Sequence, residues 1–504
     1  FGSRCWLEFI VRLSALRQQH VIPCSAVRED MGFATRARRE TDLGPAAVGI
    51  DLGTTFSRVA LWRDGDVVII PNDRGKLATP SCVAFTDSHV LIGEAAQEQA
   101  DINLENTIFA PQRLIGFKFE NPWVQWYRKS WPSKVFRGSD DKPMIRVRDQ
   151  GKERDLRPEA IVTMLLVHLR KMAERYLGVS VMDAVVTVPA QYGKLQRQAI
   201  LDACQGARLN VLDLVKAPTA AAVAYSLTNP SQGKRNVLVC DIGGSYFDFA
   251  LLTFEEGAIY ERAIGTDYVD LDNSIVRFCT QDLKEKFSTN ISGQQVALER
   301  LRRGCEAAKR RLSQYNQARI EVMAIMDGID YVCNISRGHF EVLCKDDIEP
   351  LLDPINWCLE DTGIEKSDVH EVVLVGGAAR IPRIRRAIRE FFYGMVPREV
   401  LRPDHAAVLG AAAYVALLVG SRTGDVPAEL KNIRIHQVTS FSLDATGDDG
   451  SFDQLSTVDD VGGGGGGNFK RSLTFDEPMD KIPSDGIVNY ANRTKGTHNH
   501  ADEG

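Results

Sequence analysis

Two short stretches of the sequence place an aspartate just before glycines and small hydroxyl residues. They read DLGTT at residues 51–55 and DIGG at residues 241–244. Glycine permits a tight turn, and a turn without bulky side chains lets backbone N–H groups point at a phosphate. An ionised aspartate only accepts hydrogen bonds, so it suits Mg²⁺ or its waters. Both stretches therefore predict phosphate-binding turns, whose candidate residues are Asp51, Gly53, Thr54, Thr55, Asp241, Gly243 and Gly244.

A third candidate turn, VGGAAR at residues 375–380, ends another apolar run. Gly376 and Gly377 supply the turn, and the planar guanidinium of Arg380 could stack on a purine. Ligands of open α/β sheets gather at the carboxyl ends of the strands. One such turn is more often structural than functional, but three of them in one chain predict a nucleotide site.

A predicted helix at residues 298–314 carries a polar stripe beside its apolar one. The apolar stripe is typical of a helix that packs on a core. The polar stripe consists of Glu306, Lys309, Arg310 and Ser313. Spacing alone favours a solvated charged face. The alternative is a face of donors and acceptors for an adenosine.

These residues need rigid elements to position them, and residues 48–418 alternate short β-rich runs with longer helical patterns. This alternation predicts an α/β fold. The stretches GIDLGTTFSRVALW (residues 49–62) and VCDIGGSYFDFALL (residues 239–252) share one layout, which indicates a duplicated lobe. The clearest strands are predicted at 67–70, 184–188, 237–240 and 372–375, and the clearest helices at 158–176, 195–205 and 295–314.

Composition argues against several other classes of protein. Of the 504 residues 44% are hydrophobic and 25% charged, and the net charge is −6, so we expect a globular protein that does not bind nucleic acid. We expect no apolar run of the roughly 18 residues that span a bilayer, and no membrane partner. The ten cysteines are scattered singly and the nine histidines lack metal-ligand spacing, which favours reduced thiols in the cytoplasm. A faint transit-peptide pattern at residues 1–28 makes import into an organelle the alternative.

Taken together, these motifs resemble the seventy-kilodalton heat-shock chaperone family of the actin-like ATPase superfold. The similarity covers residues 48–418 and extends well beyond the turns. The resemblance implies two ribonuclease-H-like lobes around a cleft that binds ATP or ADP with Mg²⁺. Five further stretches support the resemblance: LIGEAAQEQ (91–99), RLIGFKF (113–119), VVTVPA (185–190), PTAAAVAY (218–225) and EVVLVGGAARIPRIR (371–385).

By this resemblance the three turns become phosphate loops, and the polar stripe becomes the face that holds adenosine. Asp404, in RPDHAA, matches an acidic residue near the nucleotide. Asp51, Asp241 and Asp248 match catalytic positions, and Asp51 and Asp241 would hold Mg²⁺ through water.

The part of the site that hydrolyses ATP departs from the family's pattern. Gln112 replaces a lysine that contacts the reacting phosphate, Ala217 replaces a glutamate near the metal, and Tyr246 replaces a threonine that faces phosphate. Phosphoryl transfer depends on positioning and charge stabilisation, so a missing cation matters more than a missing neutral contact. We therefore expect nucleotide binding with weak or absent hydrolysis.

The resemblance also predicts a domain plan and partners. Asp213 replaces an arginine that docks J-domain cochaperones, so this docking should be weakened. The expected partners are nucleotide and, beyond it, exchange factors or other chaperones. By this resemblance we expect a divergent and truncated member of the family. Its predicted segments are an extension (1–47), lobe I (48–230), lobe II (231–400), a return helix (401–424), a degenerate linker with a remnant of the peptide-binding sandwich (425–450) and a disordered glycine-rich tail (451–504).

Four functions are compatible with the sequence. The first is a chaperone ATPase with weakened hydrolysis, and the second is a pseudoATPase module that regulates other chaperones. The third is a small-molecule kinase of the same superfold, against which the stretches PTAAAVAY and RLIGFKF argue. The fourth is a decayed gene copy, although the regular core pattern predicts a folded protein.

Overall fold

The computed structural model describes residues 46–230, 233–268, 270–326, 328–399 and 402–437. Within them the chain has the predicted mixed α/β architecture. The predicted tail at 451–504, and all but the last two residues of the predicted extension, lie outside the described residues.

The first large sheet gathers strands from the first half of the chain. Its order is β12-β11-β1-β2-β3, in which β1, β2 and β3 run antiparallel and β11 and β12 continue in parallel from β1. The short strand β4 pairs with β2. The bounds are β1 (Ala46–Leu52), β2 (Phe56–Arg63), β3 (Asp66–Ile69), β4 (Thr79–Pro80), β11 (Val181–Val188) and β12 (Asn210–Lys216).

The second large sheet repeats this topology. Its order is β19-β18-β13-β14-β15-β20, in which β13, β14 and β15 run antiparallel and β18 and β19 continue in parallel from β13. Two sheets with one strand order confirm the duplication that the sequence echo predicted. The bounds are β13 (Arg235–Ile242), β14 (Tyr246–Glu255), β15 (Ala258–Tyr268), β18 (Val369–Val375), β19 (Arg398–Glu399) and β20 (Arg434–His436).

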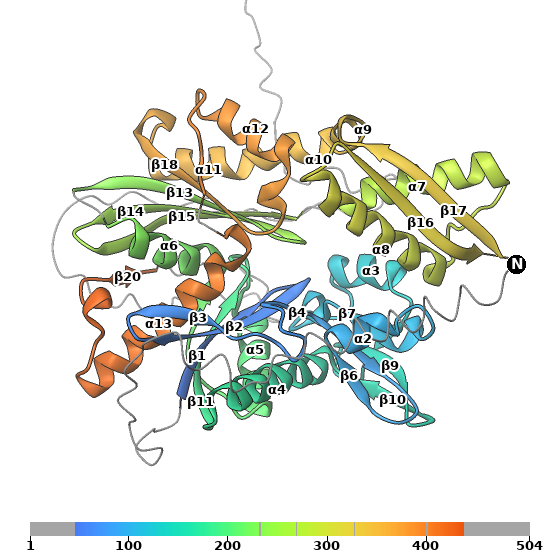
Figure 1. Cartoon of the computed structure of the whole chain (residues 1–504), viewed down its shortest axis with the longest axis horizontal. Helices are drawn as coiled ribbons and strands as arrows, with labels where there is room; N and C mark the ends of the chain where they lie inside the picture. Colours follow the sequence, from blue (N-terminus) through green and yellow to red (C-terminus); the bar gives the residue numbers. More distant parts are fainter. Residues whose placement is uncertain (1–45, 231–232, 269, 327, 400–401, 438–504) are drawn as a thin grey trace, which may run out of the picture. The chain divides into compact units, whose positions relative to one another are not determined.

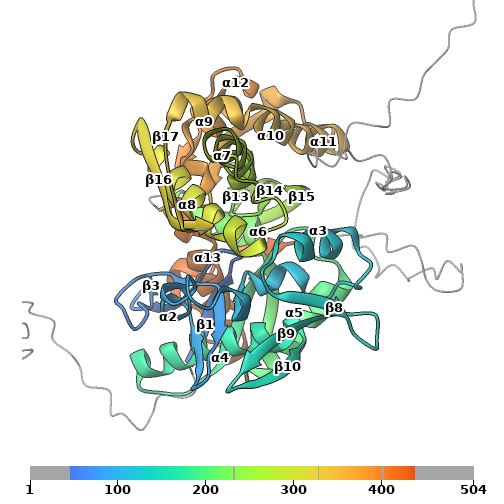
Figure 2. The ribbon, with the colours of Figure 1, turned by 90° about the vertical axis from the view of Figure 1, so that its right-hand side faces the viewer.

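Two helices lie between the sheets, as Figures 1 and 2 both show. α6 (Ala217–Thr228) contacts β13 and β14 of the second sheet, and α13 (Ala406–Thr423) contacts β1 and β2 of the first. They cross where Gly410 meets Ala220, since a Cβ on Gly410 would lie 1.6 Å from the Ala220 carbonyl oxygen. The outer face of the first sheet is covered by α4 (Pro158–Leu177) and α5 (Lys194–Gly206), whose apolar residues join its core.

The apolar character of α13 exceeds the expectation from sequence. Pro403–Thr423 is long and apolar enough to cross a membrane by length and composition, so the expectation that no run approaches that length was wrong. Its buried residues, however, pack against β1, β2, β11 and α6. These contacts are those of a core helix, and they account for its composition.

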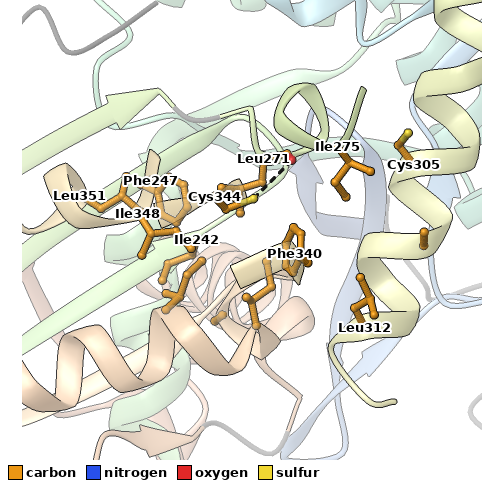
Figure 3. Close-up of a cluster of buried hydrophobic side chains, with 14 of the residues drawn as sticks. Ile242, Phe247, Leu271, Ile275, Cys305, Leu312, Phe340, Cys344, Ile348 and Leu351 are labelled. Atoms are coloured by element: carbon orange, nitrogen blue, oxygen red, sulfur yellow. Dashed lines mark hydrogen bonds between the residues drawn. The ribbon is translucent and has the colours of Figure 1, made fainter. Parts of the chain in front are cut away.

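Side chains of the second sheet and of the helices that pack on it form a core of aliphatic, aromatic and thiol groups (Figure 3). Ile242 and Phe247 of the sheet are packed in one cluster with Phe340 and Ile348, and the Cys344 thiol lies 3.8 Å from the Leu271 carbonyl oxygen. The eight cysteines in the described part of the chain are buried and free, as predicted. The bounds of this region are α7 (Leu271–Phe287), α8 (Gln295–Leu312), β16 (Gln317–Met326), β17 (Ile329–Ser336), α9 (Arg337–Leu343), α10 (Lys345–Ile348), α11 (Asp353–Thr362) and α12 (Pro382–Phe391).

Two small sheets complete the first half of the chain. One has the order β6-β5-β7 and the other β10-β9-β8. Both contribute to an aromatic core with α3, which includes Tyr127 and Trp131. The bounds are β5 (Cys82–Phe85), β6 (Val90–Ile92), α2 (Glu94–Glu98), β7 (Thr107–Phe109), α3 (Pro122–Ser130), β8 (Lys134–Arg137), β9 (Pro143–Asp149) and β10 (Lys152–Leu156).

Candidate functional site

The first predicted phosphate turn joins β1 to β2. Gly53 is required there, because a Cβ on this residue would lie 2.4 Å from the Phe56 carbonyl oxygen. The Ser81 hydroxyl donates a hydrogen bond to the Gly53 carbonyl oxygen at 2.7 Å and fixes the turn from the adjoining segment. Thr54 and Thr55 complete the turn.

The second predicted turn joins β13 to β14 and faces the first. The Gly243 N–H donates to the Tyr246 carbonyl oxygen at 2.9 Å and closes this turn. A Cβ on Gly244 would lie 2.2 Å from the Thr55 hydroxyl oxygen and 3.8 Å from that of Thr54. The structure thus brings together two turns that are about 190 residues apart in the chain and that come from different sheets.

The third predicted turn, after β18, packs against the second. Gly376 has φ +83°, and its Cβ would lie 2.3 Å from the Ile242 carbonyl oxygen and 2.7 Å from an Asp241 carboxylate oxygen. Positive φ and close backbone approach both favour glycine here. By contrast, a Cβ on Gly377 would have no neighbour within 4 Å.

Buried carboxyl groups gather where the turns meet. Burial and the negative charges of Asp248 and Asp51 raise the pKa of Asp241 to about 8. Burial also raises the pKa of Asp51, against the positive charge of Arg58 and a 2.9 Å hydrogen bond from the Thr187 hydroxyl. A divalent cation would stabilise the ionised form of such a cluster. The carboxylates of Asp51 and Asp241 therefore fit the predicted magnesium site.

Asp248 lies opposite Asp241 in the β13–β14 register. Burial raises the pKa of Asp248 to about 6, although the Thr266 hydroxyl (2.7 Å) and the Ala190 N–H (3.1 Å) donate hydrogen bonds to its carboxylate. Ala190 follows β11 of the first sheet, so Asp248 links the two sheets beside the turns.

The sequence analysis missed Arg58, which lies opposite Asp51 in the β1–β2 register. Its guanidinium nitrogens lie 3.4 Å from an Asp51 oxygen and 3.5 Å from an Asp404 oxygen. The echo between residues 49–62 and 239–252 could have found it, because Arg58 and Asp248 are each seven residues beyond the aspartate of their turn.

Asp404 connects the third turn to this cluster. Its carboxylate pairs with the guanidinium groups of Arg380 and Arg58. Burial raises the pKa of Asp404, but the hydrogen bond from Arg380 and the charges of His405 and Arg58 outweigh it and hold this pKa below its usual range. Arg380 is half exposed, and Asp404 orients its guanidinium.

The side chains of the polar stripe of α8 are held by each other and by Asp272 of α7, and the stripe adjoins the first turn. Lys309 pairs with Asp272 at 2.8 Å, Arg310 pairs with Glu306 at 2.9 Å, and the Ser313 hydroxyl donates to the Lys309 carbonyl oxygen at 3.3 Å. The Arg310 guanidinium lies 5.5 Å from the centre of the Phe56 ring, just beyond the first turn. The stripe is therefore a partly buried face beside the turns rather than a free solvated surface.

Gln112 places a neutral amide on the first turn. The side chain is buried, and its N–H donates to the Gly53 carbonyl oxygen at 3.0 Å. Its amide oxygen is buried without a hydrogen-bond partner among the described residues. The Tyr192 hydroxyl donates to the Gln112 backbone carbonyl at 2.9 Å and holds this segment.

The ring of Tyr246 packs among other aromatic rings. Its centre lies 6.5 Å from the ring of Tyr192 and 6.1 Å from that of Tyr268, edge-on in both cases. The neighbouring Ser245 hydroxyl accepts a hydrogen bond from Arg113, whose guanidinium also lies 5.0 Å from the centre of the Tyr127 ring. Arg113 therefore contacts the second turn.

A buried ion pair that sequence reasoning also missed flanks Ala217. Lys216, at the end of β12, pairs with Glu261 of β15, and the Thr219 hydroxyl donates to the same carboxylate at 2.8 Å. The two charged side chains are only 3% and 1% exposed.

Asp213, the position predicted to disfavour J-domain docking, accepts a hydrogen bond from the Tyr414 hydroxyl at 2.9 Å. The nearby Arg197 donates to the carbonyl oxygens of Tyr192 and Leu214. Arg197 thereby connects the Gln112 segment to β12.

Comparison with known proteins is consistent with this geometry. The family model described as "Hsp70 protein" matches residues 47–461. "Heat shock 70 kDa protein 2" of Paracoccidioides lutzii is 45% identical over 388 residues, which are 76% of this chain and 59% of that protein. "Heat shock 70 kDa protein" of Neurospora crassa is 45% identical over 389 residues, 76% of this chain and 60% of that protein. "Heat shock cognate 70 kDa protein 3" of Dictyostelium discoideum is 41% identical over 387 residues, 75% of this chain and 61% of that protein. The matched region thus spans about 60% of the length of these relatives.

Proposed function

The chain belongs to the Hsp70 protein family, and from this premise we propose that it binds ATP and ADP with Mg²⁺ and hydrolyses ATP slowly or not at all. The family is one of nucleotide-binding ATPases. The observation that carries the proposal is the approach of the first two turns, with the Cβ position of Gly244 2.2 Å from the Thr55 hydroxyl oxygen. Backbone N–H groups from two sheets can then converge on one polyphosphate.

In this proposal each predicted group has a separate role. Thr54, Thr55, Gly243 and Gly244 hold the phosphates, and Asp51 and Asp241 hold Mg²⁺ or its waters. The adenosine lies between the stripe of α8 and the third turn, where Arg380 is oriented by Asp404. The ion pairs of Glu306, Lys309 and Arg310 keep their side chains in place before the ligand arrives.

Weak hydrolysis follows from the chemistry at Gln112. An amide carries no charge, and its N–H is engaged by the Gly53 carbonyl oxygen. Loss of one preorganised stabilising group typically costs roughly 10² to 10³ in rate. Binding is affected less, since the backbone turns and the adenosine face do not depend on Gln112.

For the whole protein we propose a nucleotide-dependent chaperone role, which membership in the Hsp70 protein family supports. A module that regulates other chaperones is the alternative, and Asp213 supports it, because a negative charge there disfavours the J-domain contact. Cytoplasmic location stays a prediction.

The test is calorimetric titration of the protein with MgATP and MgADP, paired with a single-turnover hydrolysis assay. Micromolar binding with turnover far below that of a relative such as the Neurospora protein would support the proposal. Turnover at the relative's level that is abolished by Asp51→Asn would contradict the claim of weak hydrolysis. Absence of binding to either nucleotide would contradict the proposal as a whole.

A further inference from the structure

The two sheets differ at one pair of equivalent positions beside the turns. Asp51 faces Arg58 across β1 and β2, and Asp241 faces Asp248 across β13 and β14. Side chains directly opposite each other in an antiparallel pair lie on the same face of the sheet. The duplicated site therefore has a guanidinium in one half where the other half has a carboxylate.

Arg58 is buried but its donors are not saturated. Its side chain is 10% exposed, and its contacts to Asp51 and Asp404 measure 3.4 and 3.5 Å. Strong hydrogen bonds between a guanidinium and a carboxylate measure about 2.7–2.9 Å. The Nε atom of Arg58 is also buried without a hydrogen-bond partner among the described residues. A guanidinium has five N–H donors, so several remain for a ligand.

Carboxyl groups surround the Arg58 guanidinium. It pairs with Asp51 and Asp404, and its positive charge also acts on the buried carboxyl of Asp241. Arg380 also pairs with Asp404, but its side chain is half exposed. Arg58 is thus a buried positive charge paired with Asp51, one of the two residues proposed to hold Mg²⁺.

We propose that Arg58 is a built-in cation of the nucleotide site, whose guanidinium donates to the phosphates so that ADP and ATP bind even without Mg²⁺. This inference rests on the proposed nucleotide binding. A guanidinium is permanently charged and matches phosphate oxygens in a two-pronged geometry. It carries one charge rather than two, so Mg²⁺ still adds affinity, but less than at a site without this arginine.

The experiment is calorimetric titration of the full chain with ADP in Mg²⁺ and in EDTA, for the wild type and for Arg58→Met. Methionine is unbranched and uncharged, and it replaces the aliphatic stem of the arginine without the guanidinium. Since hydrogen bonds to charged groups are worth roughly tenfold to a hundredfold in affinity, wild-type ADP binding should weaken by less than about tenfold in EDTA. The Arg58→Met protein should lose at least about tenfold more than the wild type under the same change.

Adenosine is the ligand that separates a phosphate contact from a structural role. It lacks phosphates, and Arg58 reaches the adenosine face only through Asp404 and Arg380, so Arg58→Met should weaken adenosine binding far less than ADP binding. Arg58→Lys keeps the charge and should retain part of the metal-independent binding. The matched control is Arg63→Met, because Arg63 lies at the exposed end of the same strand.

Two results would overturn the inference while leaving the proposed function intact. One is a wild-type loss in EDTA that equals the loss in Arg58→Met. The other is an equal weakening of adenosine and ADP by Arg58→Met, which would show a structural role. If Arg58→Met does not fold, the wild-type comparison decides alone, and a loss of more than about tenfold in EDTA contradicts the inference. Failure of the wild type to bind adenosine and ADP would contradict the proposed function itself.

Discussion

Gln112 is the residue at which the proposal of slow hydrolysis is most directly testable. Its amide contacts the Gly53 carbonyl oxygen at 3.0 Å, so a longer cationic side chain from the same position would reach the first phosphate turn. Gln112→Lys should raise the single-turnover rate by about tenfold or more, because it adds charge where the transferred phosphate develops it. The control is Gln198→Lys on the exposed face of α5, which should change nothing. An unchanged rate in Gln112→Lys would show that Gln112 is not the cause of slow hydrolysis and would leave Tyr246 and Ala217 as the candidates.

Glu299 of α8 makes stability depend on pH. Burial raises the pKa of this carboxyl to about 7, against the positive charges of Arg302, Arg113 and Arg303. In the unfolded chain the pKa of a glutamate is about 4.3. Between these values the folded state binds more protons, so the free energy of unfolding decreases as the pH rises.

Glu299→Gln removes this penalty because the amide does not ionise. Thermal unfolding should show a midpoint that is higher than in the wild type by a few °C at pH 8.5 and nearly unchanged at pH 5. Glu285→Gln, on the exposed side of α7, serves as the control and should show no such difference. A larger stabilisation at pH 5 than at pH 8.5 would contradict the direction of the pKa change.

At the scale of single residues, the sequence predicted which residues form the turns better than it predicted which side chains contact one another. The aspartates, glycines and threonines of the turns were found because phosphate-binding turns restrict the residue types that they tolerate. Lys216 was not found, because a lone cation in a β-rich run has no local pattern, and Arg58 stands out only when the two echoing stretches are aligned. Only the register of β1 with β2 places Arg58 beside Asp51, and only the approach of β12 to β15 pairs Lys216 with Glu261.

Among elements, β12 and β15 are joined by the buried pair of Lys216 and Glu261. Removing one partner leaves the other charge buried and unpaired, which costs roughly 3–5 kcal/mol. We therefore expect Lys216→Ala to lower the free energy of unfolding by that amount in urea titrations. The double variant Lys216→Met with Glu261→Leu should recover much of the loss, because neither charge remains. Lys345→Ala, which breaks the exposed pair with Glu349, should change stability by less than about 1 kcal/mol.

A double variant as unstable as Lys216→Ala would show that packing at this position, and not the unpaired charge, determines stability. Thr219 distinguishes the two cases further, since its hydroxyl donates to Glu261 and contributes no charge. Thr219→Val should cost less than Lys216→Ala, because it removes one neutral donor from a carboxylate that keeps its cation.

The long elements were predictable where their patterns were strong. The helix predicted at 158–176 is α4, and the one predicted at 295–314 is α8 with its cap residues, because each has an apolar stripe of helical period on a core. The small sheets β5–β7 and β8–β10 were not predicted. Their strands are short, and their pairing depends on the aromatic core that they share with α3.

Across the whole molecule, contacts at the turns join the two sheets before any ligand is added. Arg113 donates to Ser245, the Ala190 N–H donates to Asp248, and Arg310 stacks over Phe56. The duplicated strand order followed from the sequence echo, but the facing of the turns depends on tertiary contacts that no local pattern encodes. A nucleotide between the turns would add contacts to both sheets at once, so its effect should appear in both halves of the chain.

MgADP should therefore slow amide hydrogen exchange in both phosphate turns, at residues 53–55 and 243–245, as well as in α8. At about one hundred times its Kd, the ligand adds about 2.7 kcal/mol to the free energy of unfolding, which sets the scale of the protection. The β9–β10 hairpin, which contributes no predicted ligand residue, is the internal control and should exchange at an unchanged rate. Protection confined to α8 and residues 376–380 would mean that adenosine binds without its phosphates bridging the sheets. In that case the convergence of the two turns would be a structural contact, and the proposed polyphosphate site would be wrong.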